Sequence, residues 1–152
     1  MPNVHFYWAG DGQYKDKILP VLEKYSNFHY LGSLEYPDKV REFLTEIDVY
    51  ALPTGMDTTP LSCREAMAMQ NPVVATKVGG IPEMIYDDET GFLVGEGDYQ
   101  MWIKKINVLI KDKEIGKRLG KNARELIVEK FNWDKLSKEF VDVIKPYINN
   151  KN

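Results

Sequence analysis

The stretch of sequence that decides the fold is residues 48–83, DVYALPTGMDTTPLSCREAMAMQNPVVATKVGGIPE. Its first apolar run, 48–52, stops at Pro53, and a helix is expected from about residue 60 to residue 70. A second apolar run, 73–76, then leads into a pair of glycines. Strand, helix and strand in this order, joined by short turns, are typical of two parallel strands linked by a crossover helix.

The same alternation continues on both sides of this stretch. Residues 4–9 and 28–31 are predicted strands that end at glycines, and residues 91–94 are a further short strand. Helices are expected between the strands, and everything after Gly97 has helical periodicity. We therefore predict an α/β fold in one domain over residues 1–152, a Rossmann-like, mainly parallel sheet with helices on both faces. Such sheets bind ligands beyond the carboxyl ends of their strands.

Composition excludes several classes of protein. The chain has 20 Lys and Arg against 23 Asp and Glu, a formal charge of −3, which argues against nucleic acid as a partner. Cys63 is the only cysteine, so no internal disulfide forms. No His, Cys, Asp and Glu cluster has metal-ligand spacing, so we expect no metal and no cofactor. No apolar run approaches the roughly 18 residues of a membrane span, and a cytoplasmic setting fits.

Two acidic residues flank the start of the central helix. Asp57 lies in the loop before it and Glu65 lies within it, eight positions later. On an ideal helix this is about 12 Å, too far to share a proton but suited to holding two ends of an elongated, hydroxyl-rich ligand. The free amides of the helix start could face a phosphate. The alternative is that Asp57 caps the helix and Glu65 is solvated.

Two glycine-rich turns also follow predicted strands. Gly10-Asp11-Gly12 allows close approach of a phosphate, but Lys15 occupies the third glycine position of the dinucleotide fingerprint, so an ordinary turn is an equal alternative. A dinucleotide-dependent oxidoreductase is disfavoured, because the second strand ends at Leu31-Gly32 and not at an acid. The pair Gly79-Gly80 permits close backbone approach, or serves as a plain strand-to-helix turn.

Together these motifs resemble the donor-binding, C-terminal half of GT-B glycosyltransferases, in the large family 4 (group 1) of retaining enzymes. The family pattern has two acids separated by seven residues, the second followed by Ala-Met-Ala. Further along come a Pro-Val-Val-Ala strand, Gly-Gly-x-Pro-Glu, Thr-Gly-x-Leu-Val and Gly-Asp. The matching segments here are Asp57, Glu65-Ala66-Met67-Ala68, Pro72-Val73-Val74-Ala75, Gly79-Gly80-Ile81-Pro82-Glu83, Thr90-Gly91-Phe92-Leu93-Val94 and Gly97-Asp98.

The resemblance implies a role for each matching position. Glu65 would bind the ribose hydroxyls of a nucleotide, and Asp57 the hydroxyls of the transferred sugar. The loop whose backbone would lie against the sugar and diphosphate is Thr58, Thr59, Pro60 and Leu61. The base-side loop would be Ser33, Leu34 and Glu35, and the phosphate-side loop would include Gly10 and Gly12.

The chain also departs from the family pattern. The first acid is usually Glu, and the usual Gly-Phe-Gly after it is here Thr58-Thr59-Pro60. The chain begins at what resembles the second strand of the donor domain. The first strand and helix, their Arg and Lys pair and the N-terminal acceptor domain are therefore expected elsewhere, in the same chain or another.

We thus expect no complete catalytic set in this chain and no useful transfer by it alone. The predicted ligand is a nucleotide-sugar such as a UDP- or GDP-hexose. The alternative function is a non-catalytic interaction or regulatory module that keeps the half-fold. A solvated lysine face is expected at Lys104, Lys105, Lys111 and Lys113, with peripheral contact to anionic lipid as a minor alternative in the full-length protein.

Overall fold

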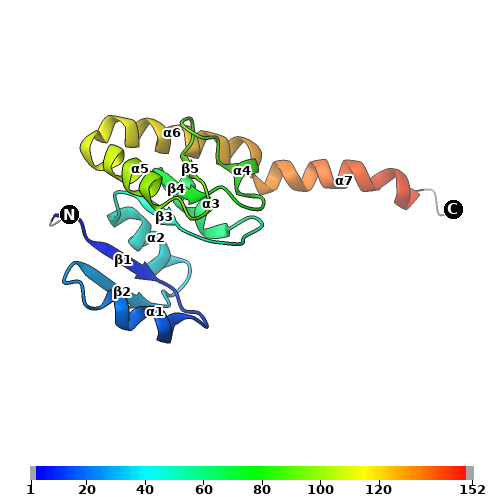
Figure 1. Ribbon diagram of the computed structural model, residues 1–152. Helices are drawn as coiled ribbons and strands as arrows, with labels where there is room; N and C mark the ends of the chain where they lie inside the picture. The colour runs from blue at the N-terminus through cyan, green and yellow to red at the C-terminus, as the bar shows by residue number, and fades with distance from the viewer. Residues whose placement is uncertain (1–2, 150–152) are drawn as a thin grey trace. The chain divides into compact units, whose positions relative to one another are not determined.

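A computed structural model describes residues 3–149, which divide into one compact unit ending at Phe43 and a second beginning at Leu44. The first unit holds β1 (Phe6–Ala9), α1 (Lys15–Leu22) and β2 (Phe28–Gly32) (Figure 1). The two strands are parallel neighbours, with Phe6 opposite Phe28. Helix α2 (Asp38–Glu46) spans the boundary between the units.

The second unit is built on a three-stranded parallel sheet. Its strands lie in the order β3 (Tyr50–Leu52), β4 (Val73–Thr76) and β5 (Phe92–Val94). Crossover helices α3 (Leu61–Ala68) and α4 (Ile81–Met84) connect these strands. Three further helices follow the sheet in the chain, α5 (Tyr99–Lys111), α6 (Lys113–Lys130) and α7 (Trp133–Asn149).

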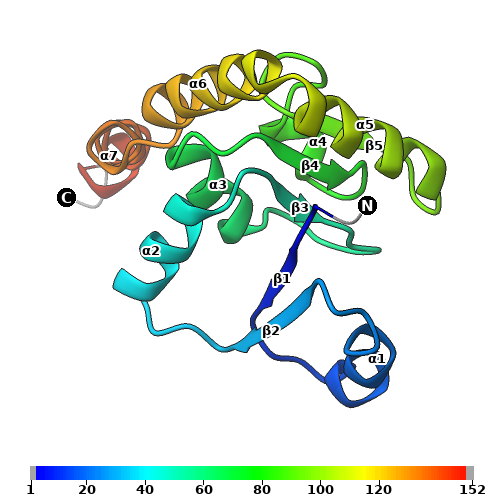
Figure 2. The ribbon, with the colours of Figure 1, turned by 90° about the vertical axis from the view of Figure 1, so that its left-hand side faces the viewer.

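The predicted fold class is confirmed, since every strand pair is parallel and the strands alternate with helices. In the second unit, α3 and α5 lie on opposite sides of the sheet (Figure 2). All four residues of β4 are buried because this strand is central and covered on both faces. Helix α1 begins at Lys15 and includes Pro20.

One part of the hydrophobic core of the second unit lies between its sheet and α5 and α6. Val74, Phe92, Val94, Leu109 and Leu119 form one buried cluster. Trp102 of α5 packs against that cluster. Burial of these side chains holds the strand ends, and therefore the loops that follow them, in fixed positions.

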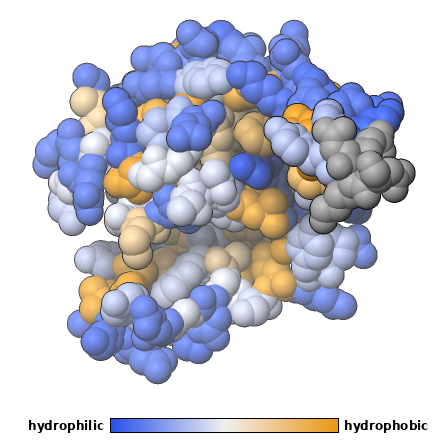
Figure 3. Space-filling view, turned by 90° about the vertical axis from the view of Figure 1, so that its right-hand side faces the viewer, coloured by the Kyte–Doolittle hydropathy of each residue, from blue (hydrophilic) through white to orange (hydrophobic). Residues whose placement is uncertain are grey.

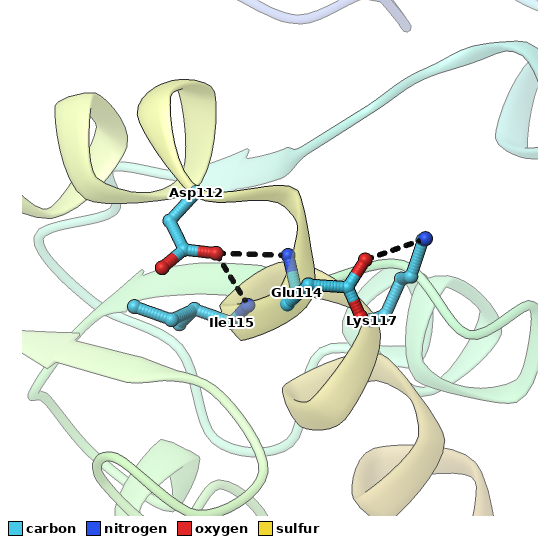
Figure 4. A network of polar contacts seen from close by, with 4 residues as sticks. All are labelled: Asp112, Glu114, Ile115 and Lys117. Carbon is cyan, nitrogen blue, oxygen red and sulfur yellow. Dashed lines mark hydrogen bonds and ion pairs between the residues drawn. The ribbon is translucent and has the colours of Figure 1, made fainter.

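The junction between α5 and α6 is fixed by one side chain (Figure 4). The Asp112 carboxylate accepts hydrogen bonds from the backbone N–H groups of Glu114, at 3.0 Å, and Ile115, at 3.3 Å. Lys117 donates to the Glu114 carboxylate at 2.7 Å. Asp112 is thus an N-cap that lets α6 begin directly after α5 ends.

Large apolar side chains are also exposed. Hydrophobic patches interrupt the hydrophilic surface on the face that Figure 3 shows. In α7, Phe140 and Tyr147 are 64% and 77% exposed. No described residue before Leu44 is buried, so the buried core of residues 3–149 belongs to the second unit.

Candidate functional site

The loops that follow β3, β4 and β5 meet at the carboxyl edge of the sheet. The Thr76 hydroxyl at the end of β4 donates to the carbonyl of Leu52 at 3.4 Å, and Lys77 N–H donates to the carbonyl of Val94 at 2.7 Å. The three strands therefore end side by side. This is the edge at which parallel sheets bind ligands, and both predicted acids lie on the segment that leaves it after β3.

The loop after β3 is packed against the glycine pair that follows β4. A Cβ built on Gly79 would lie 1.8 Å from the carbonyl oxygen of Asp57, and one built on Gly80 would lie 2.0 Å from that of Thr58. The backbone that closely approaches these glycines is that of the protein's own loop at Asp57 and Thr58, and the pair also forms the strand-to-helix turn, since Gly80 is the N-cap of α4.

Asp57 is not the cap of α3. The N-cap is Pro60, in an extended conformation, and no side chain caps the helix. Asp57 is half-buried, while Thr58, Thr59 and Leu61 are exposed and Pro60 is buried. The capping alternative is therefore wrong, and the N-cap residue of α3 offers no side-chain acceptor to the first N–H groups of the helix.

Glu65 lies in the second turn of α3, next to the buried pair Ala66 and Met67. Its side chain is half-buried, and this desolvation raises the pKa of the Glu65 carboxyl. Glu65 is therefore not the freely solvated helix residue of the alternative interpretation. A partly desolvated carboxylate forms stronger hydrogen bonds with a ligand than a fully hydrated one does.

Sequence reasoning missed Tyr50 as a member of this site, because it looked like one more apolar residue of a strand. Burial raises the pKa of Tyr50 to about 12, the negative charges of Glu65 and Asp57 raise it further, and a hydrogen bond with Ser62 opposes the shift. The phenol therefore stays neutral at physiological pH. An aromatic residue with a hydroxyl, rather than Val or Ile, was the available signal.

Cys63 lies on the same helix and is fully buried. Burial raises the pKa of its thiol to about 12, and the charge of Asp57 acts in the same direction. A thiol that stays protonated is a poor nucleophile, so Cys63 contributes packing to α3.

Helix α6 anchors α3 from the opposite end. A Cβ on Gly120 would lie 1.9 Å from the carbonyl oxygen of Gln70, which shows that the two backbones touch. Arg124 donates a hydrogen bond to the carbonyl of Ala68, the last residue of α3. The helix that holds Glu65 is thus fixed through its C-terminal backbone.

The first unit holds the predicted phosphate-side and base-side loops. In the former, the Gly12 N–H donates to the Asp11 carboxylate at 2.7 Å, and Lys15 is 3.2 Å from the same carboxylate. The Gly12 backbone, and then Lys15, lower the pKa of Asp11. The Gly12 amide is therefore already engaged. In the base-side loop Ser33 and Glu35 are exposed and Leu34 is half-buried.

Neither a metal site nor a membrane span is found within residues 3–149. No group of three or more His, Cys, Asp or Glu side chains in this range could hold a metal ion. Within the same range, no helix combines the length and the apolar character needed to cross a bilayer.

Comparison with known proteins assigns the chain to a family. The profile described as Glycosyl transferases group 1 matches residues 1–126. The chain belongs to the group 1 glycosyltransferases. The sulfoquinovosyl transferase SQD2 of Arabidopsis thaliana, a relative, is 33% identical over 136 residues, which are 88% of this chain and 26% of SQD2.

Solved structures of glycosyltransferases have the same fold. HepE of Anabaena in complex with UDP superimposes with a TM-score of 0.86 at 21% identity, covering 96% of this chain and 42% of HepE. A mutant of TarM from S. aureus, solved with UDP among its ligands, gives a TM-score of 0.82 at 26% identity, covering 93% of this chain and 29% of TarM. This group 1 chain thus spans less than half the length of each.

Proposed function

We propose that this chain is the nucleotide-sugar donor-binding part of a retaining glycosyltransferase that transfers a hexose to an acceptor. The observation that carries the proposal is the placement of Asp57 and Glu65, two half-buried carboxylates on consecutive parts of one loop and helix at the carboxyl edge of the sheet. The UDP bound in the structures of HepE and TarM supports a nucleoside diphosphate as the ligand.

Each acid takes one part of the donor. Glu65 accepts hydrogen bonds from the two neighbouring ribose hydroxyls, because a carboxylate offers two oxygens to a vicinal diol. Asp57 accepts from hydroxyls of the hexose. The uncapped N–H groups at the start of α3 face the diphosphate, since a helix N-terminus favours an anion. The roles of Gly10 and Gly12 toward phosphate, and of Ser33, Leu34 and Glu35 toward the base, remain predictions.

Transfer itself needs residues beyond these. The leaving diphosphate develops negative charge, which must be stabilised by fixed positive charge. Two cations near the predicted loops are already engaged, because Lys15 pairs with Asp11 and the Arg64 guanidinium lies over the ring of Phe131. We therefore propose that binding resides in this chain and that transfer requires the acceptor domain and its own basic residues.

A thermal-shift panel of UDP, GDP, ADP and their common sugar conjugates tests the proposal. A ligand at 100 times its Kd stabilises the fold by roughly 2.7 kcal/mol, and the shift should disappear in Glu65→Ala. Glu83→Ala is the matched control, because Glu83 is an exposed acid in the first turn of α4. If no ligand of the panel raises the melting temperature, or if the rise persists in Glu65→Ala, donor binding at this site is contradicted.

The second candidate function is a non-catalytic interaction module. It is favoured by the replacement of the family's Gly-Phe-Gly with Thr58-Thr59-Pro60. Such a module forms a stable complex with a chain that holds an acceptor domain and gives no shift with any nucleotide. Clear nucleotide binding by a monomeric chain would exclude it.

A further inference from the structure

The loop that contains Asp57 has an internal support that the proposed function does not use. Gly79 and Gly80 follow β4, and their Cα atoms face the backbone of residues 57 and 58. Both contacts lie within the second unit, where β3 and β4 are parallel neighbours with Leu52 opposite Ala75. The loop after β3 therefore packs directly against the loop after β4.

Gly80 is required to be glycine because there is no room for a side chain, and not because of its backbone conformation. Gly79 has φ +53°, a conformation that favours glycine in any case. Gly80 has φ −86°, which any L-residue adopts, so its conformation does not call for glycine. What excludes a side chain there is the Thr58 carbonyl oxygen, 2.0 Å from the Cβ position, with the Thr59 methyl at 3.3 Å.

A side chain at either position moves the loop. The overlapping atoms belong to the backbone, so no rotamer change relieves the contact. Separating a Cβ on Gly79 from the Asp57 carbonyl, now 1.8 Å away, to a normal contact requires a displacement of about 1.6 Å. The Asp57 carboxylate would move with its backbone, whereas Glu65 on the anchored helix α3 would not.

We infer that Gly79 and Gly80 are positioning residues of the sugar end of the donor site, and that they set the preference for a nucleotide-sugar over the bare nucleoside diphosphate. The inference rests on the proposed function, in which Asp57 contacts the sugar and Glu65 the ribose. A displaced loop loses contacts to the sugar and keeps those to the nucleotide. A hydrogen bond to a carboxylate amounts to roughly tenfold in affinity, so that is the expected selective loss.

Two pairs of variants separate contact from strain. Gly80→Ala creates the contact without backbone strain, and its control Gly95→Ala meets only the Asp98 Cβ at 4.0 Å. Gly79→Ala adds strain at positive φ, and its control Gly97→Ala has a similar φ, +73°, with nothing within 4 Å. Gly95→Ala thus controls for the glycine-to-alanine change without backbone strain. Gly97→Ala controls for the same change with backbone strain, and neither creates a close contact.

The experiment has two readouts on the full chain. In amide NMR spectra the signals of Thr58 and Thr59 should shift in Gly79→Ala and Gly80→Ala but not in the controls. Calorimetry with UDP and UDP-glucose should show affinity for UDP-glucose falling roughly tenfold more than affinity for UDP in the same two variants. A general loss of stability would weaken both ligands equally.

The two claims fail in different ways. Unchanged Thr58 and Thr59 signals in Gly80→Ala overturn the inference whether or not a ligand binds. Equal losses for UDP and UDP-glucose also overturn it, while leaving donor binding intact. Failure of the wild-type chain to bind any nucleotide or nucleotide-sugar of the panel overturns the proposed function and the selectivity claim together.

Discussion

The guanidinium carbon of Arg64 lies 4.4 Å from the centre of the Phe131 ring. This cation–π contact joins α3, one residue before Glu65, to the C-cap of α6. The Nε atom of Arg64 is buried and has no hydrogen-bond partner within residues 3–149, so the aromatic face is the main compensation for its burial. The contact therefore helps to hold α3 in place, the helix that carries Glu65, the residue proposed to bind ribose.

Replacing Phe131 tests how much this cation–π contact contributes to stability. Phe131→Leu keeps apolar volume but removes the ring, and it should lower the free energy of unfolding by about 1 kcal/mol, the range of a cation–π contact. Phe131→Tyr retains the ring and should stay near wild type. Urea unfolding of the three proteins provides the comparison, and equal stability of the Leu and Tyr variants would show that the ring face contributes nothing.

A pair of glycines in α6 gives the sharpest stability contrast. Gly120→Ala should destabilise the fold by roughly 2 kcal/mol or more, because its Cβ would overlap the Gln70 carbonyl oxygen at 1.9 Å. Gly116→Ala meets only the Pro72 side chain at 3.6 Å and the Leu109 side chain at 3.9 Å. It should stabilise the helix by about 0.5–1 kcal/mol. The same sign in both melting temperatures would refute the close packing of α6 on α3.

Glu65 gives donor binding a defined dependence on pH. Burial raises the pKa of its carboxyl above the ordinary 4.5, so it protonates earlier on acidification than an exposed Glu does. Affinity for UDP should therefore fall as pH decreases from 7 toward 4.5. The free protein changes in the opposite sense, because a raised carboxyl pKa favours folding once the group is neutral. Glu65→Gln should have low affinity with little pH dependence, and a wild-type profile in that variant would exclude Glu65.

Asp57 is expected to affect the sugar and not the nucleotide. Asp57→Asn removes the charge with little change in shape and should reduce affinity for UDP-glucose roughly tenfold while affinity for UDP changes little. Asp57→Glu restores the acid that is usual in the family, so it should keep the preference for the sugar conjugate. Calorimetry with both ligands measures this, with Glu83→Gln as control. An equal loss of both ligands in Asp57→Asn would place Asp57 at the nucleotide end instead.

The buried thiol predicts the response to alkali. The pKa of Cys63 rises from 9.0 to about 12 on folding, so the unfolded chain loses its proton first and stability falls as pH rises above 9. At pH 10 the loss from this group is on the order of 1 kcal/mol. Tyr50, raised from 10.0 to about 12, adds its own loss above pH 10.

Urea unfolding at pH 8 and pH 10 measures this change. Cys63→Ala has no thiol to titrate, so it should lose less stability than wild type between the two pH values, by a difference on the order of 1 kcal/mol. The change in unfolding free energy between pH 8 and pH 10 is compared in the two proteins. Any effect of the smaller side chain that does not depend on pH therefore cancels. Identical losses in both proteins would mean that the thiol ionises as easily in the folded chain as in the unfolded one.

Most of the fold could be predicted from the sequence, and the candidate site only in part. Strand 73–76 was predicted with its observed ends because Pro72 and the following turn punctuate a fully apolar run. The contact of Gly80 with Thr58 could not be predicted, because it depends on the packing of two loops that are distant in sequence. Tyr50 was overlooked for the same reason, since its neighbours Ser62 and Glu65 are contributed by a later helix.

The concentration of buried residues after Leu44 has a consequence for any measurement of unfolding. Amide protons of β4 and of the buried turns of α6 should exchange with solvent most slowly, and those of β1 and α1 most rapidly. A calorimetric melting curve then reports chiefly the disruption of the second unit, in which Asp57 and Glu65 lie. Trp8 and Trp102 lie in different units, so a fluorescence trace from each tryptophan, with the others replaced, would report on the unfolding of its own unit.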